Sequence, residues 1–256
     1  TVIASPFPTH YEYLKKSIDS GLSVLCEKPF IWDVAGDIVR KTEALITKAR
    51  RKKLTLAMNS QLPFTIASYE RLCGKITPEE THRFLINMNP SMTGEAMIPE
   101  SLPHPLSILY YTLGKGEISQ ISFDSFTKRS MTISFQYKTA VTKCQATVHL
   151  KTKETQPREL SFGFNGRMIK RAINAKNYAI YCQYRNKRIK ITDPLELSIK
   201  SFARSFRNKS EAVIGDDHIL NNMSLLKKIY DAYKENKSAT ASGFKSKEHD
   251  FAAKLK

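Results

Sequence analysis

Cysteine is scarce in this sequence of 256 residues: there are four, scattered along the chain and without a CxxC pair. Scattered single cysteines make neither a disulfide framework nor a zinc site, so we expect free thiols, a reducing compartment and a cytoplasmic location. The spacings of histidine and carboxylate residues suggest no metal site either. Apolar runs are short, and none is long enough to span a bilayer.

Acidic residues are few relative to basic ones. The chain has 24 Asp and Glu against 41 Lys and Arg, which gives a formal net charge of +17. Such an excess attracts anionic ligands and polyanions, but it says little about the fold. The remaining composition, with 41% hydrophobic residues, is that of a globular protein of one or two domains.

One basic segment raises the question of nucleic-acid binding. Aromatic residues and cations are interleaved there: Tyr178, Tyr181, Tyr184, Arg185, Lys187, Arg188 and Lys190. Such a hairpin could contact a phosphate backbone or stack on bases. Strand alternation, however, places Tyr181 on the face opposite Tyr178 and Tyr184, so the rings form no single platform. We therefore favour a solvated hairpin over a nucleic-acid site.

The stretch that organises the chain is residues 24–29, Val-Leu-Cys-Glu-Lys-Pro. A short apolar run bounded by Gly21 and Pro29 predicts a strand buried on both faces. Pro29 cannot continue a ladder of hydrogen bonds, so Lys28 is expected at the carboxyl end of the strand. Ligands bind at that end in open parallel sheets. The pattern therefore predicts that the chemistry takes place around Lys28.

The first part of the chain alternates between strand and helix patterns. Over residues 1–59 the order is strand, helix, strand, helix, strand, which predicts half of a Rossmann-like, doubly wound parallel sheet; the family resemblance given below implies that it is the C-terminal half. Asp33 is the expected N-cap of the second helix, and Val34 is expected on its inner face. The fold class of this part is α/β.

The pattern changes in the second part, residues 60–236. Over 117–192 the side chains alternate with a period of two, which predicts a large, mostly antiparallel sheet in an α+β domain. Met131, Phe135 and Tyr137 are expected to face the chain's own helices, which leaves the other face for a second subunit. The last helix could pack back on the first domain, and residues 237–256 are expected to form a mobile basic tail.

Four pieces of the sequence, in order, resemble motifs of one enzyme family. They are Val-Ile-Ala-Ser-Pro at 2–6 with His10, residues 21–29 ending in Glu-Lys-Pro, Glu-Ser-Leu-Pro-His at 100–104, and Ile-Tyr-Asp-Ala at 229–232. Together they resemble the glucose–fructose oxidoreductase / inositol dehydrogenase / MocA (Gfo/Idh/MocA) family. The resemblance implies an oxidoreductase that uses NAD or NADP and transfers a hydride to or from a sugar-like or polyol-like hydroxyl or carbonyl. It also implies a homo-oligomer formed through the antiparallel sheet.

The sequence departs from that family in its cofactor loop. No GxGxxG turn follows a strand, although the family uses one to bind the pyrophosphate at a helix N-terminus. We expect such a segment to precede Thr1 in the full-length protein. The alternative is a non-catalytic interaction or scaffold protein that keeps the fold but cannot bind the dinucleotide. Gln61 also stands where the family often has arginine, so that contact cannot be transferred.

The resemblance implies a set of site residues. His104 would be the base that accepts the hydroxyl proton, Lys28 the cation beside the oxygen and Glu100 the carboxylate that orients the imidazole. Glu27 and Pro29 would shape the strand end next to the nicotinamide.

Three further residues, Ser5, Pro6 and His10, would line the cofactor side. Three of the residues in this set also have a plainer interpretation. Lys28 could be a solvated turn residue, His104 a helix cap and His10 a structural residue. Prolines on both sides of His104 also disfavour a helix there, so Glu100 and His104 need not share a helical face.

Overall fold

The computed structural model describes residues 1–33, 36–124 and 127–253, with side chains described as far as residue 238. It contains a three-stranded parallel sheet, the small sheet, in the order β1-β2-β3. A second sheet, the large sheet, has eight strands in the order β11-β10-β9-β8-β4-β7-β6-β5. The predicted combination of a partial Rossmann-like sheet with a large, mostly antiparallel one is confirmed.

The elements of the first part are β1 (Val2–Ile3), η1 (Phe7–Thr9), α1 (His10–Asp19), β2 (Val24–Glu27), α2 (Ile38–Arg51) and β3 (Leu56–Asn59). Those that follow, as far as the second sheet, are η2 (Leu62–Thr65), α3 (Ile66–Cys73), η3 (Pro78–Glu80), η4 (Gly94–Ala96), α4 (Met97–Ser101) and α5 (Pro103–Leu113). The chain closes with α6 (Pro194–Asn208) and α7 (Asp216–Ala253).

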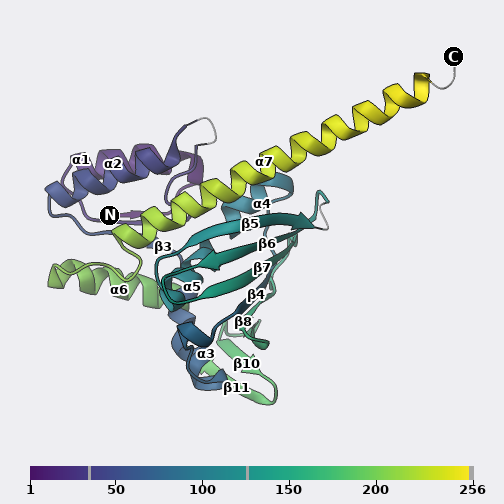
Figure 1. Ribbon diagram of the computed structural model, residues 1–256. Helices are drawn as coiled ribbons and strands as arrows, with labels where there is room; N and C mark the ends of the chain where they lie inside the picture. Colours follow the sequence, from purple (N-terminus) through teal and green to yellow (C-terminus); the bar gives the residue numbers. More distant parts are fainter. Residues whose placement is uncertain (34–35, 125–126, 254–256) are drawn as a thin grey trace.

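Strand β2 is buried on both faces, as its apolar run predicts. Val24 and Cys26 belong to the main core, together with Leu14 of α1. Leu25 points the other way and packs with Phe202 of α6. Helices α1 and α2 therefore cover one face of the small sheet and α6 covers the other (Figure 1).

The start of α2 differs from the prediction. The N-cap is Asp37, whose carboxylate accepts a hydrogen bond from the backbone N–H of Arg40 at 2.9 Å. Asp33 instead forms an ion pair with Lys41 at 2.5 Å. Both aspartates precede the apolar stripe, and only the path of the loop decides which one reaches the free N–H groups. Val34 lies outside the described residues.

The large sheet is built from β4 (Arg83–Met88), β5 (Glu117–Asp124), β6 (Ser130–Lys138), β7 (Lys143–Lys151), β8 (Leu160–Phe164), β9 (Arg167–Ile173), β10 (Ile180–Tyr184) and β11 (Lys187–Ile191). Strands β4 and β7 pair in parallel, and the other neighbours are antiparallel. Met131, Phe135 and Tyr137 are buried, as predicted. The opposite face is polar, and its pairing with a second subunit stays a prediction that solution scattering can test.

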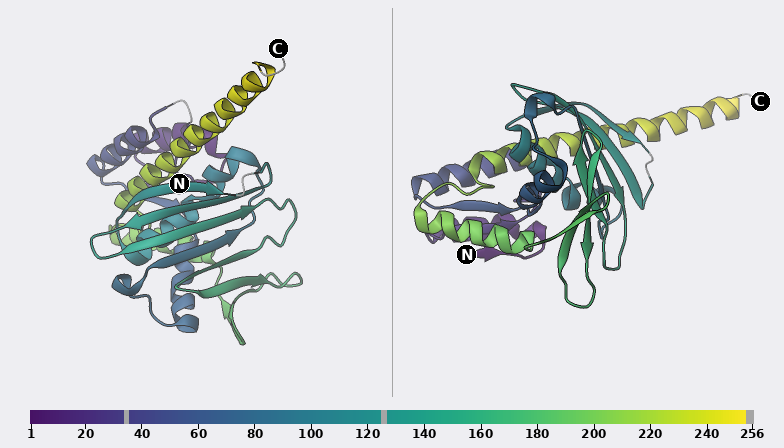
Figure 2. Two further views of the ribbon diagram at one scale, coloured as in Figure 1. Left: turned by 45° about the vertical axis from the view of Figure 1, so that its right-hand side comes forward. Right: turned by 90° about the horizontal axis from the view of Figure 1, so that it is seen from below.

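Helix α7 links the two parts of the molecule. It packs on α2 of the first part and on α5 and β5 of the second. Trp32 and Tyr230 meet edge to face there, with their ring centroids 5.0 Å apart. The helix continues to Ala253, where a mobile tail was expected, and its last turns extend away from the sheets (Figure 2). Within the described chain, no helix combines the length and apolar character needed to cross a membrane.

Candidate active site

Lys28 lies at the carboxyl edge of the small sheet, directly after β2. Its Nζ donates to the backbone carbonyl of Glu100 at 2.5 Å, so the lysine reaches across to α4. The carboxylate of the preceding Glu27 accepts hydrogen bonds from the backbone N–H of Lys28 at 3.3 Å and from the Asn59 side chain at the end of β3. Glu27 thus joins the ends of two parallel strands and fixes the backbone that carries the lysine.

A pocket of about 190 Å³ opens beside Lys28. We call it the carboxyl-edge pocket. Its walls come from both parts of the chain and include Lys28, Gln61, Glu100, His104, Arg158 and Arg171. Lys28 and His104, the cation and the base that the resemblance implies, therefore line one pocket.

Glu100 and His104 share a helical face despite the flanking prolines. Leu102, between α4 and α5, has helical dihedral angles (φ −62°, ψ −29°), and the N–H of Leu106 donates to its carbonyl at 3.1 Å. Prolines fit here because they occupy the first turn of α5, where the N–H groups have no partner within the helix. The expectation that prolines disrupt the helix is wrong for this position.

Ser60, which the sequence analysis missed, contacts the imidazole of His104. Its Oγ lies 3.3 Å from Nδ1 of His104 and donates to the carbonyl of Pro103 at 3.3 Å. With the serine proton on the Pro103 carbonyl, the serine oxygen can accept from Nδ1–H, and Nε2 is then the unprotonated nitrogen. Ser60 follows β3 directly, so the strand-edge rule that singled out Lys28 could have found it.

The imidazole is held in its neutral form. Burial lowers the pKa of His104 well below its usual value, and the positive charges of Lys28 and Arg171 lower it further. Burial also lowers the pKa of the Lys28 ammonium, against the opposing effect of Glu100 and Glu27. The arrangement can therefore accept a proton at one point and offer a cation at another.

Glu100 belongs to the site, but its carboxylate does not serve the imidazole. It accepts hydrogen bonds from the N–H and Oγ of Ser91, at 3.0 and 2.5 Å, and from the N–H of Met92 at 2.7 Å. The carboxylate fixes the turn after β4, and only the backbone carbonyl of Glu100 meets Lys28. The orienting role expected for Glu100 is thus corrected: the contact to Nδ1 comes from Ser60.

The residues expected on the cofactor side include a structural histidine. The side chain of His10 is fully buried, and its ring nitrogens lie 2.8 Å from the carbonyl of Pro29 and 2.9 Å from that of Ser5. His10 therefore joins the turn after β1 to the turn after β2. Ser5 is half-buried and Pro6 is exposed at the end of the same strand.

Two arginines complete the carboxyl-edge pocket, and neither was predicted. Arg171, on β9, donates from Nη2 to the carbonyl of Arg158 at 3.2 Å, while its Nε is buried without a hydrogen-bond partner. Burial lowers the pKa of Arg171. Their positions depend on how the large sheet packs against the small one, so no local pattern in the sequence points to them.

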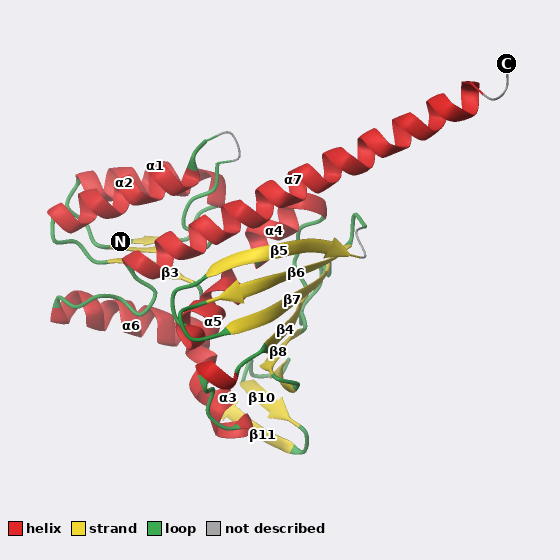
Figure 3. Ribbon diagram, in the orientation of Figure 1, coloured by secondary structure: helices red, strands yellow, loops and turns green. Residues whose placement is uncertain are grey.

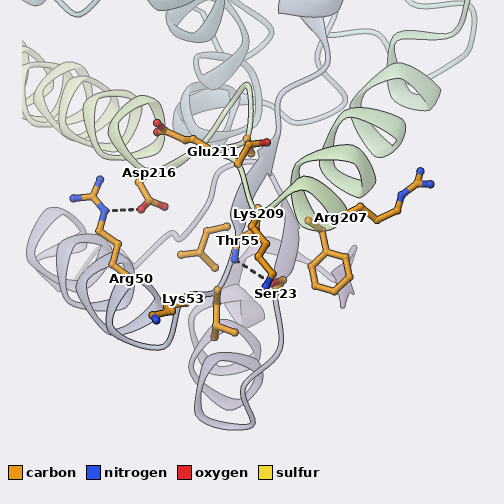
Figure 4. A pocket seen from close by; sticks show the side chains of 13 residues that line it. Ser23, Arg50, Lys53, Thr55, Arg207, Lys209, Glu211 and Asp216 are labelled. Carbon is orange, nitrogen blue, oxygen red and sulfur yellow. Dashed lines mark hydrogen bonds and ion pairs between the residues drawn. The ribbon is translucent and has the colours of Figure 1, made fainter.

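A larger cavity, of about 850 Å³, lies at the opposite edge of the small sheet. We call it the amino-edge cavity. Ser23 and Thr55, which precede β2 and β3, form part of its wall, and the N–H of Thr55 donates to Ser23 Oγ (Figure 4). Arg50, at its rim, pairs with Asp216 at 2.7 Å. Lys53 is exposed to solvent. None of the predicted site residues lines this cavity.

In the basic hairpin of β10 and β11, two arginines contact tyrosine rings of the same hairpin. The Arg188 guanidinium lies 3.9 Å from the ring centroid of Tyr181, and that of Arg185 lies 5.2 Å from that of Tyr184. Tyr178 stands in the turn before β10 with φ of 56°, so the strand alternation assumed for it does not apply. Its ring is 80% exposed and lies outside the strand.

No protein-family model matches the chain, and no curated protein does. Solved structures do. A dehydrogenase from Chromobacterium violaceum superposes over 95% of this chain and 79% of its own, with a TM-score of 0.70 and 13% identity. The chain has a dehydrogenase fold. The UDP-N-acetylglucosamine 3-dehydrogenase of Acidithiobacillus ferrooxidans covers 90% of this chain and 77% of its own, with a TM-score of 0.66 and 16% identity.

A 3-ketoreductase from Actinomadura kijaniata, solved with TDP-benzene and NADP, shares this dehydrogenase fold. It covers 89% of this chain and 75% of its own, with a TM-score of 0.63 and 16% identity. The resemblance noted in the sequence thus agrees with the fold. The two observations are independent, because the motifs concern a few residues and the superposition concerns the whole backbone.

Proposed function

We propose that the protein is an oxidoreductase that transfers a hydride between NAD or NADP and a hydroxyl or carbonyl group of a sugar-like or polyol-like substrate. One observation carries the proposal. In a dehydrogenase fold, a neutral histidine and a partly buried lysine line the same pocket at the carboxyl edge of the parallel sheet. That edge is where open parallel sheets bind their ligands.

The described residues fit only part of a dinucleotide. The strand end at Glu27 and Lys28 offers a place beside the pocket, but a pyrophosphate needs backbone N–H groups at the start of a helix. The turn after β1 contains Pro6 and Pro8, which have no N–H, and it contains no glycine. This turn therefore lacks the glycine-rich loop with which dinucleotide-binding folds hold the phosphates.

The chain's own contribution is the movement of a proton. Nε2 of His104 is the free acceptor, and a substrate hydroxyl beside it can give up its proton as the carbon is oxidised. Nζ of Lys28 keeps two N–H groups beyond the one used by Glu100, and these can stabilise the oxygen as negative charge develops. Ser60 holds the imidazole in the tautomer that this step requires.

The proposal is tested first by dinucleotide binding and then by turnover of substrate. Fluorescence titration of the full-length protein with NADH and with NADPH should give saturable binding, and a panel of sugars and polyols should then show cofactor-dependent turnover. If neither dinucleotide binds, the oxidoreductase proposal is overturned and the alternative, an interaction protein that keeps the fold, is favoured.

A further inference from the structure

We propose that the carboxyl-edge pocket takes a small anionic substrate, a sugar-sized polyhydroxy compound whose acidic group binds Arg171 and Arg158. This inference rests on the proposed function for the reacting hydroxyl, but the binding of the anion does not depend on a dinucleotide. It explains a feature that the proton transfer leaves unused: two guanidinium groups at the wall of the pocket away from the small sheet.

The charges around the pocket do not balance. Lys28, Arg158 and Arg171 are cations that line it. Of the two carboxylates in its wall, that of Glu100 is taken up by the turn at Ser91 and Met92. The other, Glu159, is mostly exposed and lies 3.9 Å from Lys170. Among the described residues, no acidic side chain forms an ion pair with Arg158 or Arg171.

Arg171 is the residue that most needs a partner. It is partly buried in the large sheet, it donates from Nη2 to a backbone carbonyl at 3.2 Å, and its Nε is enclosed without a hydrogen-bond partner. A buried charge without a counter-ion is costly, and a planar guanidinium matches the two oxygens of a carboxylate or phosphate. Arg158 uses its backbone carbonyl and Nε in protein contacts, and the residue lines the same pocket.

The size of the pocket limits the ligand. Its volume of about 190 Å³ is below the roughly 300–1,000 Å³ of pockets that enclose drug-sized molecules. The pocket therefore suits the reacting sugar-sized part of a ligand. His104 lines the same pocket as Lys28 and Arg171, and the charges of both act on its imidazole. A ligand with an acid at one end and a hydroxyl a few carbons away can reach Arg171 and His104 together.

Isothermal titration calorimetry without cofactor tests this inference. The probes are D-glucuronate, D-glucose 6-phosphate and D-glucose. We expect at least one of the two anions to bind about 10- to 100-fold more tightly than D-glucose, since a charge-assisted pair to arginine is lost in the neutral sugar. A preference for D-glucuronate indicates a sugar acid, and a preference for the phosphate indicates a sugar phosphate.

Variants locate the binding. Arg171→Met should abolish the preference for the anion, Arg171→Lys should restore part of it, and Lys53→Met in the amino-edge cavity should leave it unchanged. Arg158→Met gives a second reading if Arg171→Met does not fold. Equal affinity for D-glucose and both anions, no binding of either anion at millimolar concentration, or an unchanged preference in the folded arginine variants would overturn the inference.

These outcomes separate the two proposals. Anion binding through Arg171 in a protein that binds neither NADH nor NADPH would reject the oxidoreductase and keep the anion site. Cofactor-dependent turnover of neutral polyols with no preference for anions would do the opposite.

Discussion

The two cavities of this protein lie at opposite edges of one small sheet and differ in the surroundings of their cations. The amino-edge cavity is the larger, at about 850 Å³ against about 190 Å³, yet its lysines are solvated and its Arg50 is paired with Asp216. At the carboxyl edge, Lys28 and Arg171 are partly buried, and burial has lowered the pKa of each. Desolvation of the charged groups, rather than volume, distinguishes the candidate active site.

The largest expected effect separates the two edges directly. Lys28→Met should lower kcat by about 100-fold or more, because a cation beside the developing oxyanion is lost. Lys53→Met, at the amino edge, should leave kcat unchanged. Steady-state kinetics with NADH or NADPH measure both kcat values. Equal values for Lys28→Met and wild type would contradict the role of Lys28 in stabilising the substrate oxygen.

A second comparison concerns two buried histidines. Burial lowers the pKa of His218, in the first turn of α7, to about 3, while the pKa of His104 is lowered by burial and by cations. An unfolded histidine has a pKa near ~6.5, so between about pH 6.5 and pH 3 the unfolded chain binds more protons than the folded one. The free energy of unfolding should therefore fall as the pH is lowered through this window, with His218 accounting for about 2 kcal/mol at about pH 5.

His218→Phe tests that contribution. Phenylalanine can keep the stacking on Tyr110, whose ring centroid lies 4.2 Å from that of the imidazole, but it does not titrate. Urea denaturation between pH 7 and pH 5 should show a shallower loss of stability in this variant than in wild type. The same slope in both proteins would mean that His218 is already protonated, or solvated, in the fold.

Glu100→Gln should act on the shape of the carboxyl-edge pocket. The amide keeps one acceptor for the turn at Ser91 and Met92 but loses the charge that strengthens these hydrogen bonds, at a cost of about 1–2 kcal/mol of stability. We expect KM to rise more than kcat falls, because the proton path through Ser60 and His104 remains. A fall in kcat alone would return Glu100 to the orienting role first expected for it.

The smallest effect concerns the cap of α2, away from both cavities. Asp37→Ala should cost about 1 kcal/mol in the free energy of unfolding, since its carboxylate accepts from the N–H of Arg40. Asp33→Ala should cost less, because its ion pair with Lys41 is partly exposed. Chemical denaturation gives both values, and the reverse order would support the cap predicted from the sequence.

Elements set by local chemistry could be predicted from the sequence. The apolar run of β2 between Gly21 and Pro29 placed Lys28 at a strand end. Helices α3 and α5 end at Gly74 and Gly114, with φ of 92° and 89°, which glycine adopts without strain and which make glycine a helix-end signal in a sequence. Alternation over residues 130–138 identified the buried face of β6.

The parts that depend on tertiary contacts could not be predicted. Asp33 and Asp37 are equivalent as caps until the loop path is known. Ser60 reaches His104 only because η2, which follows it, packs on α5. Arg171 lies on a strand 143 positions beyond Lys28. The net charge suggested an anionic ligand, but nothing in it indicated which of the 41 basic residues lose their water.

The central claim is that Lys28 and His104 share one desolvated pocket, and an NMR titration of the His104 ring nitrogens tests it most directly. We predict a neutral imidazole protonated on Nδ1 at neutral pH, with a pKa below the usual ~6.5. In Lys28→Met the pKa should rise, because a neighbouring positive charge is removed. A His104 pKa near ~6.5 that does not move when Lys28 is replaced would contradict the account.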